Sequence, residues 1–440
     1  MVIPRLMEEL EERGEPIAVA VIGVGAMGAG AMHKMAGMAG IRCSVAADLD
    51  VERAVASYEM NGIGRDQILI SDNAVKCRQA IASGKPVVTD NALIVPELNV
   101  DAVLEATGST SFGARIAYES ILAGKHVAML TVETDVVVGP ILARMADSAN
   151  VVYTLASGDQ PGAILEMYHW ARTLGFEVVA AGRGEIRYPE DRYQGPHEET
   201  RGRPWVSTSP RMENSFRDGT KAQIEMAAVS NSTGLLPDVR GMHTPQVGVR
   251  GLPRVFRRKA DGGILSRKGV IETANSVNEE GTLVGEDQVG NGVFLVIDSP
   301  HPGDKELIRH FFSHQGGTGG ALYRPYLLTC LEAPMSIVRA ALFHVETAKP
   351  QKLHSELLTL AKKDLASGDI LDGAGGETVY AQVEKAQIAY TENCLPFGFA
   401  ENVEVLRPVK KDQVLTYEDV GVQTDEFLYW LRRLQDLTVK

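Results

Sequence analysis

The chain has few cysteines, no long apolar run and no excess of positive charge. Its four cysteines, Cys43, Cys77, Cys330 and Cys394, are scattered, and no two of them form a C-x-x-C pair. Scattered thiols argue against a disulfide framework and a thiolate zinc site, and they are typical of a reducing compartment. No apolar run has the length of a membrane span, and residues 1–15 are acidic and amphipathic, unlike a signal peptide. We therefore expect a cytoplasmic protein with no membrane partner.

Positive charge is also scarce, because the net charge is −13 at pH 7. This balance argues against nucleic acid or an anionic membrane as a partner. What the chain does have is length and apolar content, with 440 residues of which 44% are hydrophobic. Such a chain is too long for one hydrophobic core, so the composition predicts two or three globular domains.

A glycine-rich turn follows the first apolar run of the chain. Ile17–Ile22 is apolar and β-prone, which predicts a buried strand, and Gly23, Gly25 and Gly28 follow it as G-x-G-x-x-G. In a dinucleotide-binding turn the first glycine permits the tight bend, the second lets a pyrophosphate approach the backbone, and the third lets the helix pack on the sheet. The order of strand, turn and helix predicts a dinucleotide site, although a plain glycine turn in a βαβ unit would share the pattern.

Ala26 and Met27 lie in this turn at the start of the next helix, where free backbone N–H groups attract phosphate. Asp48 follows the second apolar run, at the distance where a carboxylate accepts hydrogen bonds from a ribose diol. Asp48 favours NAD(H), because a carboxylate repels a 2′-phosphate. Arg53 lies nearby and could bind such a phosphate, so the sequence leaves NADP or NAD open as the cofactor.

Strand-like and helix-like segments alternate between residues 17 and 157. This alternation predicts an α/β fold with a Rossmann-type doubly wound parallel sheet, whose cofactor crevice lies at the C-terminal ends of the strands. The further candidates for cofactor binding at this edge are Thr107, Gly108, Ser109, Glu133 and Gly158. Ser109 has the alternative role of a helix cap, and Gly158 that of a hinge turn.

The pattern changes after residue 157. Residues 158–347 combine helices with an expected open β-sheet over 237–330, which predicts an α+β domain for substrate binding and dimerisation. Residues 332–346 form an amphipathic helix that could return to the first domain, and 348–440 read as a small β-rich module. The predicted domains are therefore 1–157, 158–347 and 348–440.

Several segments resemble known families. VLEATGS at residues 103–109 and AGKHVAML at 123–130 look like the cofactor domain of homoserine dehydrogenases, and residues 156–184 look like the segment that follows it. KDLASGDIL at 363–371 and KKDQVLTYEDV at 410–420 resemble an SAF domain. The combination is similar to the DXR-like oxidoreductases, the DRL family, and covers nearly the whole chain.

This resemblance implies an NAD(P)H-dependent oxidoreductase. The group includes enzymes that convert 1-deoxy-D-xylulose 5-phosphate to 2-C-methyl-D-erythritol 4-phosphate in isoprenoid biosynthesis. The resemblance also implies an acid shortly before a catalytic lysine, and Asp218 and Lys221 occupy the matching stretch, DGTKAQIEMA. Two departures are visible: the spacing is three instead of the four typical of homoserine dehydrogenases, and Thr131-Val132-Glu133-Thr134 replaces their T-A-N-K. Homoserine is therefore not the expected substrate.

Lys221 is the candidate for the proton transfer that accompanies hydride transfer. Its ammonium group would polarise a carbonyl and protonate the alkoxide during reduction. Asp218 could orient this lysine, or it could only cap the helix that begins beside it. The ordinary alternative for Lys221 is a solvent-exposed lysine in a first helical turn.

A rearranging enzyme would also need a divalent metal ion, and Glu213, Asp218 and Glu225 could supply oxygen ligands. Their spacing identifies no metal site, so the metal ligands are unknown. His310 and His314 lie four residues apart, but no third ligand accompanies them. A phosphorylated substrate would need cations. One segment offers five of them, namely Arg183, Arg187, Arg192, Arg201 and Arg203.

Together these patterns predict a reductase of a small phosphorylated or polyhydroxylated keto compound, with reductoisomerase activity among the options. We expect it to act as a homodimer or higher homo-oligomer. One alternative is an NAD(P)-dependent dehydrogenase of a hydroxy acid or sugar acid. The other is a nicotinamide-binding sensor without turnover, an idea that the altered segment around Glu133 favours.

Overall fold

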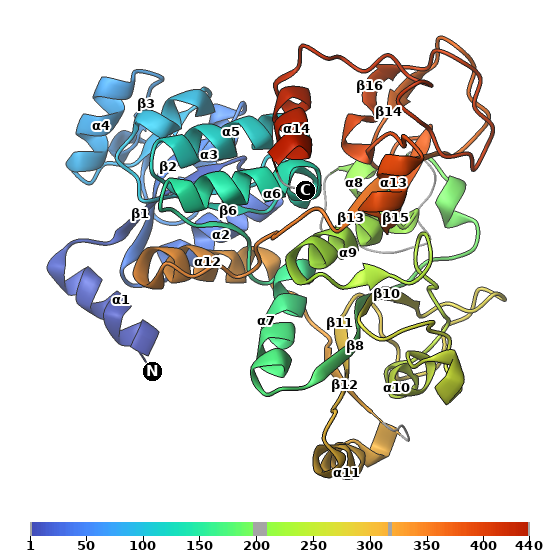
Figure 1. Cartoon of the computed structure of the whole chain (residues 1–440). Coiled ribbons are helices and arrows are strands. Elements are labelled where there is room, and N and C mark those ends of the chain that lie inside the picture. Colours follow the sequence, from blue (N-terminus) through green and yellow to red (C-terminus); the bar gives the residue numbers. More distant parts are fainter. Residues whose placement is uncertain (1, 197–208, 316–318, 439–440) are drawn as a thin grey trace. The chain divides into compact units, whose positions relative to one another are not determined.

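The computed structural model describes residues 2–196, 209–315 and 319–438. The chain forms two compact units, each built from separate stretches of sequence (Figure 1). Unit 1 contains Met1–Gly162, Leu328–Pro350 and Phe427–Lys440, and unit 2 contains Ala163–Leu327 and Gln351–Glu426. This interleaving differs from the three consecutive domains expected from the sequence. Within the described ranges, no helix has the length and apolar character needed to cross a membrane.

Unit 1 is built on a seven-stranded sheet in which every described pair of neighbouring strands is parallel. The strand order is β3-β4-β2-β1-β5-β6-β7. Strand β1 is buried along its whole length, as expected for an apolar run covered on both faces. This sheet confirms the predicted Rossmann-type fold. The strands are β1 Ile17–Ile22, β2 Ile41–Ala47, β3 Leu69–Ile70, β4 Val87–Thr89, β5 Ala102–Glu105, β6 His126–Met129 and β7 Tyr153–Leu155.

Polar residues at strand ends begin several helices of unit 1. Asp50, Asn73 and Ser109 each accept a hydrogen bond from the third following amide, so they cap α3, α4 and α5. The helices of this unit are α1 Val2–Arg13, α2 Ala26–Ala36, α3 Val51–Glu59, α4 Ala74–Ala82, α5 Thr110–Leu122, α6 Val132–Ser148, α12 Thr329–Phe343 and α14 Phe427–Thr438.

Helix α12 confirms the expected return of the chain to the first unit, because it packs against α2. Gly30 of α2 allows this approach. A Cβ atom on Gly30 would lie only 2.6 Å from the Sγ atom of Cys330 in α12. The buried side chains of Ala333 and Ile337 then join the same core as Val19 of β1.

Helix α14 also belongs to unit 1, where it packs against α6. Pro140 lies inside α6 and disturbs its backbone ladder. Gln435 inserts its amide there, accepting a hydrogen bond from the Ile141 amide at 3.1 Å and donating one to the Val137 carbonyl at 3.0 Å. In a regular α-helix the Ile141 amide would donate to the Val137 carbonyl. Gln435 therefore supplies hydrogen-bond partners to these two groups next to the proline, where helices tend to be interrupted.

Unit 2 contains a mixed five-stranded sheet in the order β12-β11-β8-β10-β9. Strands β8, β10 and β9 run parallel, whereas β11 and β12 are antiparallel to their neighbours. Phe256 stacks on Phe294 in the core on one face of this sheet, with ring centroids 5.4 Å apart. The strands are β8 Glu177–Glu185, β9 Leu236–Pro237, β10 Val270–Asn275, β11 Val293–Asp298 and β12 Gly320–Arg324.

The C-terminal strands of unit 2 form two small antiparallel pairs, as the predicted β-rich module requires. They are β13 Ser355–Ala361 with β15 Val379–Lys385, and β14 Ile370–Asp372 with β16 Glu401–Glu404. The helices are α7 Gln160–Thr173, which begins in unit 1, and α8 Pro210–Arg217, α9 Thr220–Thr233, α10 Leu252–Val255, α11 Pro302–Phe311 and α13 Ala386–Thr391.

The open β-sheet expected over residues 237–330 needs correction. Only three strands of the five-stranded sheet, β10, β11 and β12, lie wholly inside this range, and helices α10 and α11 interrupt them. Both helices carry a proline in their first turn, where its missing N–H group costs nothing. The glycine-rich turns of this segment hid these helix starts.

Candidate active site

The glycine turn of unit 1 has the backbone geometry that its spacing predicts. Gly23 has φ +88°, and a Cβ atom there would lie 2.6 Å from the Ala106 carbonyl oxygen. A Cβ atom on Gly28 would lie 2.0 Å from the Gly23 carbonyl oxygen, so the helix packs directly on the turn. A Cβ atom on Gly25 would meet no described atom within 4 Å. The first and third glycines are thus needed for packing, and the second leaves open space beside the start of α2, where Ala26 and Met27 lie.

Asp48 lies at the end of β2 and binds back to the glycine turn. Its Oδ2 atom accepts a hydrogen bond from the Val24 amide at 2.6 Å, and its Oδ1 atom pairs with the guanidinium of Arg53 at 2.6 Å. Burial raises the pKa of Asp48, but the hydrogen bonds from Arg53 and from the Asp50 and Val24 amides outweigh it and hold the pKa below its ordinary value. The carboxylate is therefore charged and fixed beside the turn.

The turns after β5 and β6 are held by Thr107 and Thr131 together with Glu105, a residue that the sequence did not single out. The Thr107 amide and hydroxyl both donate to Glu105 Oε1, and the Gly108 amide donates to the Thr131 hydroxyl at 3.0 Å. Glu105 is fully buried, and burial raises its pKa although the hydrogen bonds from Thr107 oppose this. Glu105 thus positions the candidate Thr107, and Thr131 positions Gly108. The signal for it was an acid inside an otherwise apolar strand.

Ser109 has the capping role that was weighed for it, because its hydroxyl accepts a hydrogen bond from the Phe112 amide. Glu133 lies half-buried in the first turn of α6. Gly158 has φ +80°, and a Cβ atom there would lie 2.6 Å from the Cβ atom of Glu332 in α12. Gly158 is therefore needed where α12 packs, whether or not it contacts a ligand.

Lys221 lies in unit 2, in the first turn of α9, and is 7% exposed. The ordinary interpretation as a solvent-exposed lysine is therefore wrong. Strand β15 holds the start of this helix, because the Ala381 amide donates to the Thr220 hydroxyl and the Val383 amide donates to Gln223 Oε1. Burial and the positive end of a helix dipole both make this a costly place for a cation.

Asp218 precedes α9 and is fixed by groups on either side. Its Oδ2 atom pairs with Lys362 Nζ at 2.7 Å, and its Oδ1 atom accepts a hydrogen bond from the Thr220 amide at 2.8 Å. Both side chains of this ion pair are almost fully buried. Burial raises the pKa of Asp218, and Lys362 only partly opposes this. Lys362 comes from the β-rich module, and no sequence pattern linked it to Asp218.

The candidate metal ligands have other partners. Glu225 is buried and forms an ion pair with Arg183, while Asp218 pairs with Lys362. Among the described residues, no group of three or more metal-ligating side chains is assembled. Glu213 lies in α8, half-buried. A tightly held divalent ion would need several oxygen ligands. Two of the three candidate acids, Asp218 and Glu225, are already paired with a lysine or an arginine.

The arginine-rich segment is dispersed. Arg187 lies 3.3 Å from Glu185 in an ion pair, and Arg192 lies over the ring of Tyr380, 5.2 Å from its centroid. Arg201 and Arg203 lie outside the described residues, as does the side chain of His314. His310 is exposed on α11. The three described arginines of this segment, Arg183, Arg187 and Arg192, are thus each engaged with another side chain of the protein.

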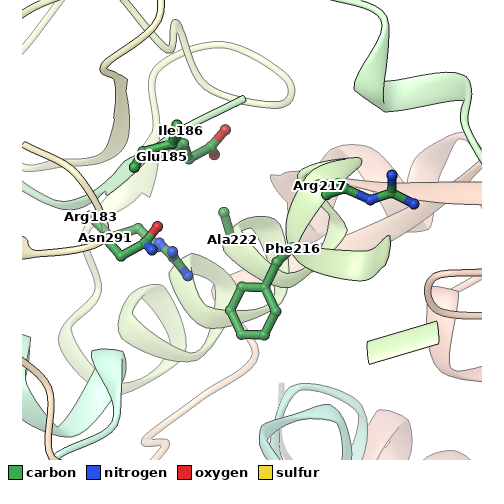
Figure 2. Close-up of a pocket in the computed structure, with 7 residues that line it drawn as sticks. All are labelled: Arg183, Glu185, Ile186, Phe216, Arg217, Ala222 and Asn291. Carbon is green, nitrogen blue, oxygen red and sulfur yellow. The ribbon is translucent and has the colours of Figure 1, made fainter. Parts of the chain in front are cut away.

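A small pocket in unit 2 opens beside the start of α9 (Figure 2). Ala222, the residue after Lys221, lines this pocket. Figure 2 shows the guanidinium of Arg217 pointing away from Arg183. The full lining consists of Arg183, Glu185, Ile186, Phe216, Arg217, Ala222 and Asn291.

Residues 158–333 match the family described as Oxidoreductase DRL, catalytic domain. No curated protein sequence matches the chain. The solved structures with similar folds include a probable dehydrogenase from Thermotoga maritima, with 13% identity, 74% of this chain and 88% of that chain covered, and a TM-score of 0.38. They also include a UDP-N-acetylglucosamine 3-dehydrogenase from Acidithiobacillus ferrooxidans, with 14% identity, 76% and 92% covered, and a TM-score of 0.37.

A third solved structure is myo-inositol dehydrogenase from Lactobacillus casei in complex with NAD(H) and myo-inositol. It has 15% identity, 41% of this chain and 49% of that chain covered, and a TM-score of 0.27. Such low scores give these likenesses no weight for the function. The family match is different in kind, because it covers α9 and the pocket. The chain is an enzyme of the oxidoreductase class, and residues 158–333 are similar to the catalytic domain of the DRL oxidoreductases.

Proposed function

We propose that the chain is an NAD(P)H-dependent reductase of a small polyhydroxylated or phosphorylated keto compound. The observation that carries this proposal is the buried position of Lys221 in the first turn of α9, inside the oxidoreductase catalytic domain. The glycine turn and Asp48 of unit 1 support the cofactor part of the proposal. When bound, a reduced nicotinamide supplies the hydride that converts a carbonyl to an alkoxide.

The residues of unit 1 would bind and orient the dinucleotide. The open side of Gly25 leaves room for a pyrophosphate next to the amides at the start of α2. Asp48 would accept hydrogen bonds from the ribose hydroxyls. Arg53 is already paired with Asp48, so it is poorly placed to neutralise a 2′-phosphate. This arrangement favours NADH over NADPH.

Lys221 would act on the substrate oxygen. Its ammonium group would donate a hydrogen bond to the carbonyl before reduction and then transfer one proton to the alkoxide, which gives a neutral alcohol and a neutral amine. Asp218 and Lys362 would act through position, because they fix the backbone at the start of α9. The ion pairs of Asp218 and Glu225 favour plain reduction over a metal-assisted rearrangement such as the formation of 2-C-methyl-D-erythritol 4-phosphate.

The test compares Lys221→Ala with Lys363→Ala, a matched control at an exposed lysine of the same unit. Oxidation of NADH and NADPH is followed by nicotinamide absorbance, with keto sugars, keto acids and their phosphate esters as substrates. Lys221→Ala is expected to lower turnover by a factor of about 100 or more and to leave cofactor affinity unchanged. Full activity of Lys221→Ala would refute the role of this lysine. Cofactor binding without turnover on any substrate would favour the sensor.

A further inference from the structure

Glu185 is the unusual member of the pocket beside α9. The residue is 4% exposed and lines the pocket at the end of β8. Neither of its carboxylate oxygens accepts a hydrogen bond from any described residue, and Arg187 Nε lies 3.3 Å from Oε2 as an ion-pair contact. A buried carboxylate normally accepts several hydrogen bonds, so two acceptor atoms that lack them at a pocket wall point to a ligand that donates.

The two arginines of the pocket offer little to an anion. Arg183 is paired with the buried Glu225, and its Nε atom donates to the Gly184 carbonyl. The terminal nitrogens of Arg217 donate to Gln194, Gly195 and Asn214. The charge of Arg183 is therefore compensated by Glu225, and the terminal N–H donors of Arg217 are occupied by neutral acceptors of the protein.

One N–H donor of Arg217 remains unused. Its Nε atom is buried and has no hydrogen-bond partner among the described residues. The lining residues thus hold two unused acceptors on Glu185, one unused donor on Arg217, and the side-chain amide of Asn291, which both donates and accepts. Hydroxyl groups match this mixture, because each hydroxyl donates once and accepts as well. A phosphate dianion can only accept, and it would be repelled by Glu185.

We propose that this pocket binds adjacent hydroxyl groups of an uncharged polyol chain, with Glu185 as their acceptor. The inference rests on the proposed function and sharpens it: the substrate is a neutral polyhydroxy keto compound, and a phosphate ester at this position is rejected. Ala222 lines the pocket and follows Lys221 in the first turn of α9, so the pocket lies beside the helical turn that carries the lysine. The hydroxyl chain would extend from the carbonyl on which Lys221 acts.

The test uses a matched pair of probes, ribitol and ribitol 5-phosphate, which differ only by the phosphate. Their binding to the full chain is measured by calorimetry without cofactor, so the result does not depend on turnover. Ribitol is expected to bind more tightly than its phosphate ester. Glu185→Gln keeps the size of the side chain and removes its charge. It should weaken ribitol by about tenfold or more and reduce the discrimination against the phosphate. Glu279→Gln, at an exposed acid of the same unit, should change neither affinity.

A second variant guards against misfolding of Glu185→Gln. Asn291 is exposed before β11, so Asn291→Ala should fold and should weaken ribitol a few-fold. The inference is overturned if ribitol does not bind, if the phosphate ester binds more tightly, or if Glu185→Gln and Asn291→Ala leave ribitol affinity unchanged. Failure of the proposed function would look different: ribitol would bind as expected, and no keto compound would oxidise the reduced cofactor.

Discussion

The two units bury their carboxylates beside different partners. In unit 1, Glu105 and Asp135 are fully buried, and their hydrogen-bond donors are the neutral groups of Thr107 and Tyr153. Burial raises the pKa of both acids, and it raises that of Asp135 from 3.8 to about 7. A buried acid with neutral partners is tolerated because it can keep its proton.

In unit 2, Asp218 and Glu225 are equally buried, but each pairs with a cation, Lys362 or Arg183. An acid paired in this way depends on its partner, since removal of the cation leaves a buried charge without compensation. The comparison shows that different changes should destabilise the two units. Unit 1 is sensitive to the loss of a proton, and unit 2 is sensitive to the loss of a cation.

The largest expected effect is that of Lys362→Met, which leaves Asp218 without its counter-ion. Removing one partner of a buried ion pair costs about 3–5 kcal/mol, so the free energy of unfolding of unit 2 should fall by this amount. Denaturant unfolding measures it. The double variant Asp218→Asn with Lys362→Met should recover most of the loss. A loss below about 1 kcal/mol, the range of exposed ion pairs, would remove the contrast between the units.

Asp135→Asn tests the other side of the comparison through pH. Because the folded state holds the Asp135 proton up to about pH 7 and the unfolded state releases it near its ordinary pKa of 3.8, the folded state binds more protons in that window. Stability therefore falls as pH rises through it, by about 1 kcal/mol per pH unit for this group. Asp135→Asn should remove that slope, measured as the difference in unfolding free energy between wild type and variant. If the difference in unfolding free energy between wild type and Asp135→Asn did not change with pH in this window, the protonation of Asp135 would not contribute to the pH dependence of stability.

A smaller effect is expected at the glycine turn, where geometry and ligand binding can be separated. Gly23→Ala combines a positive φ with a clash against the Ala106 carbonyl and should cost about 2 kcal/mol of stability as well as cofactor affinity. Gly25→Ala should lower cofactor affinity and leave stability nearly unchanged, because its Cβ atom meets no described neighbour. Gly14→Ala is the control, because Gly14 also has a positive φ of +67° but a Cβ atom there meets no described atom within 4 Å, so this variant measures the cost of the positive φ alone. Equal cofactor affinity in wild type and Gly25→Ala would show that the pyrophosphate does not bind at this turn.

The smallest effect is expected for Gln435→Ala. The Ile141 amide and the Val137 carbonyl would each lose a partner, at a cost of about 1 kcal/mol or somewhat more. Leu437→Ala, at an exposed position of the same helix, is the matched control. Thermal unfolding of both variants measures the difference. Equal unfolding temperatures would mean that α6 closes its own ladder around Pro140.

The parts of the molecule that could be predicted are those built from neighbouring residues. Ile17–Ile22 and the three glycines after it determine their own turn, and Asp48 sits one strand away. The partner of Asp218 could not be predicted in this way, because Lys362 lies 144 residues further along the chain and neither residue marks the other.

The pocket shows a second limit of prediction. The arginine-rich segment offered cations for a phosphate, but in the fold Arg183 pairs with Glu225, and the acid Glu185 lines the pocket beside it. Charge signs along a sequence do not show which charges cancel in the fold. Only the strand register, which pairs Arg183 with Thr273 of β10, and the packing of α9 decide this.

The two hydrogen bonds that Gln435 makes to α6 also have a consequence for folding during translation. The ribosome releases residues 427–438 after all of unit 2, so the nascent Rossmann-type sheet waits for its last helix while more than half of the chain emerges. All of unit 2 is made during this interval. The Rossmann-type unit is thus the first to begin and the last to finish, because α6 receives the hydrogen bonds of Gln435 only after residues 427–438 have been made.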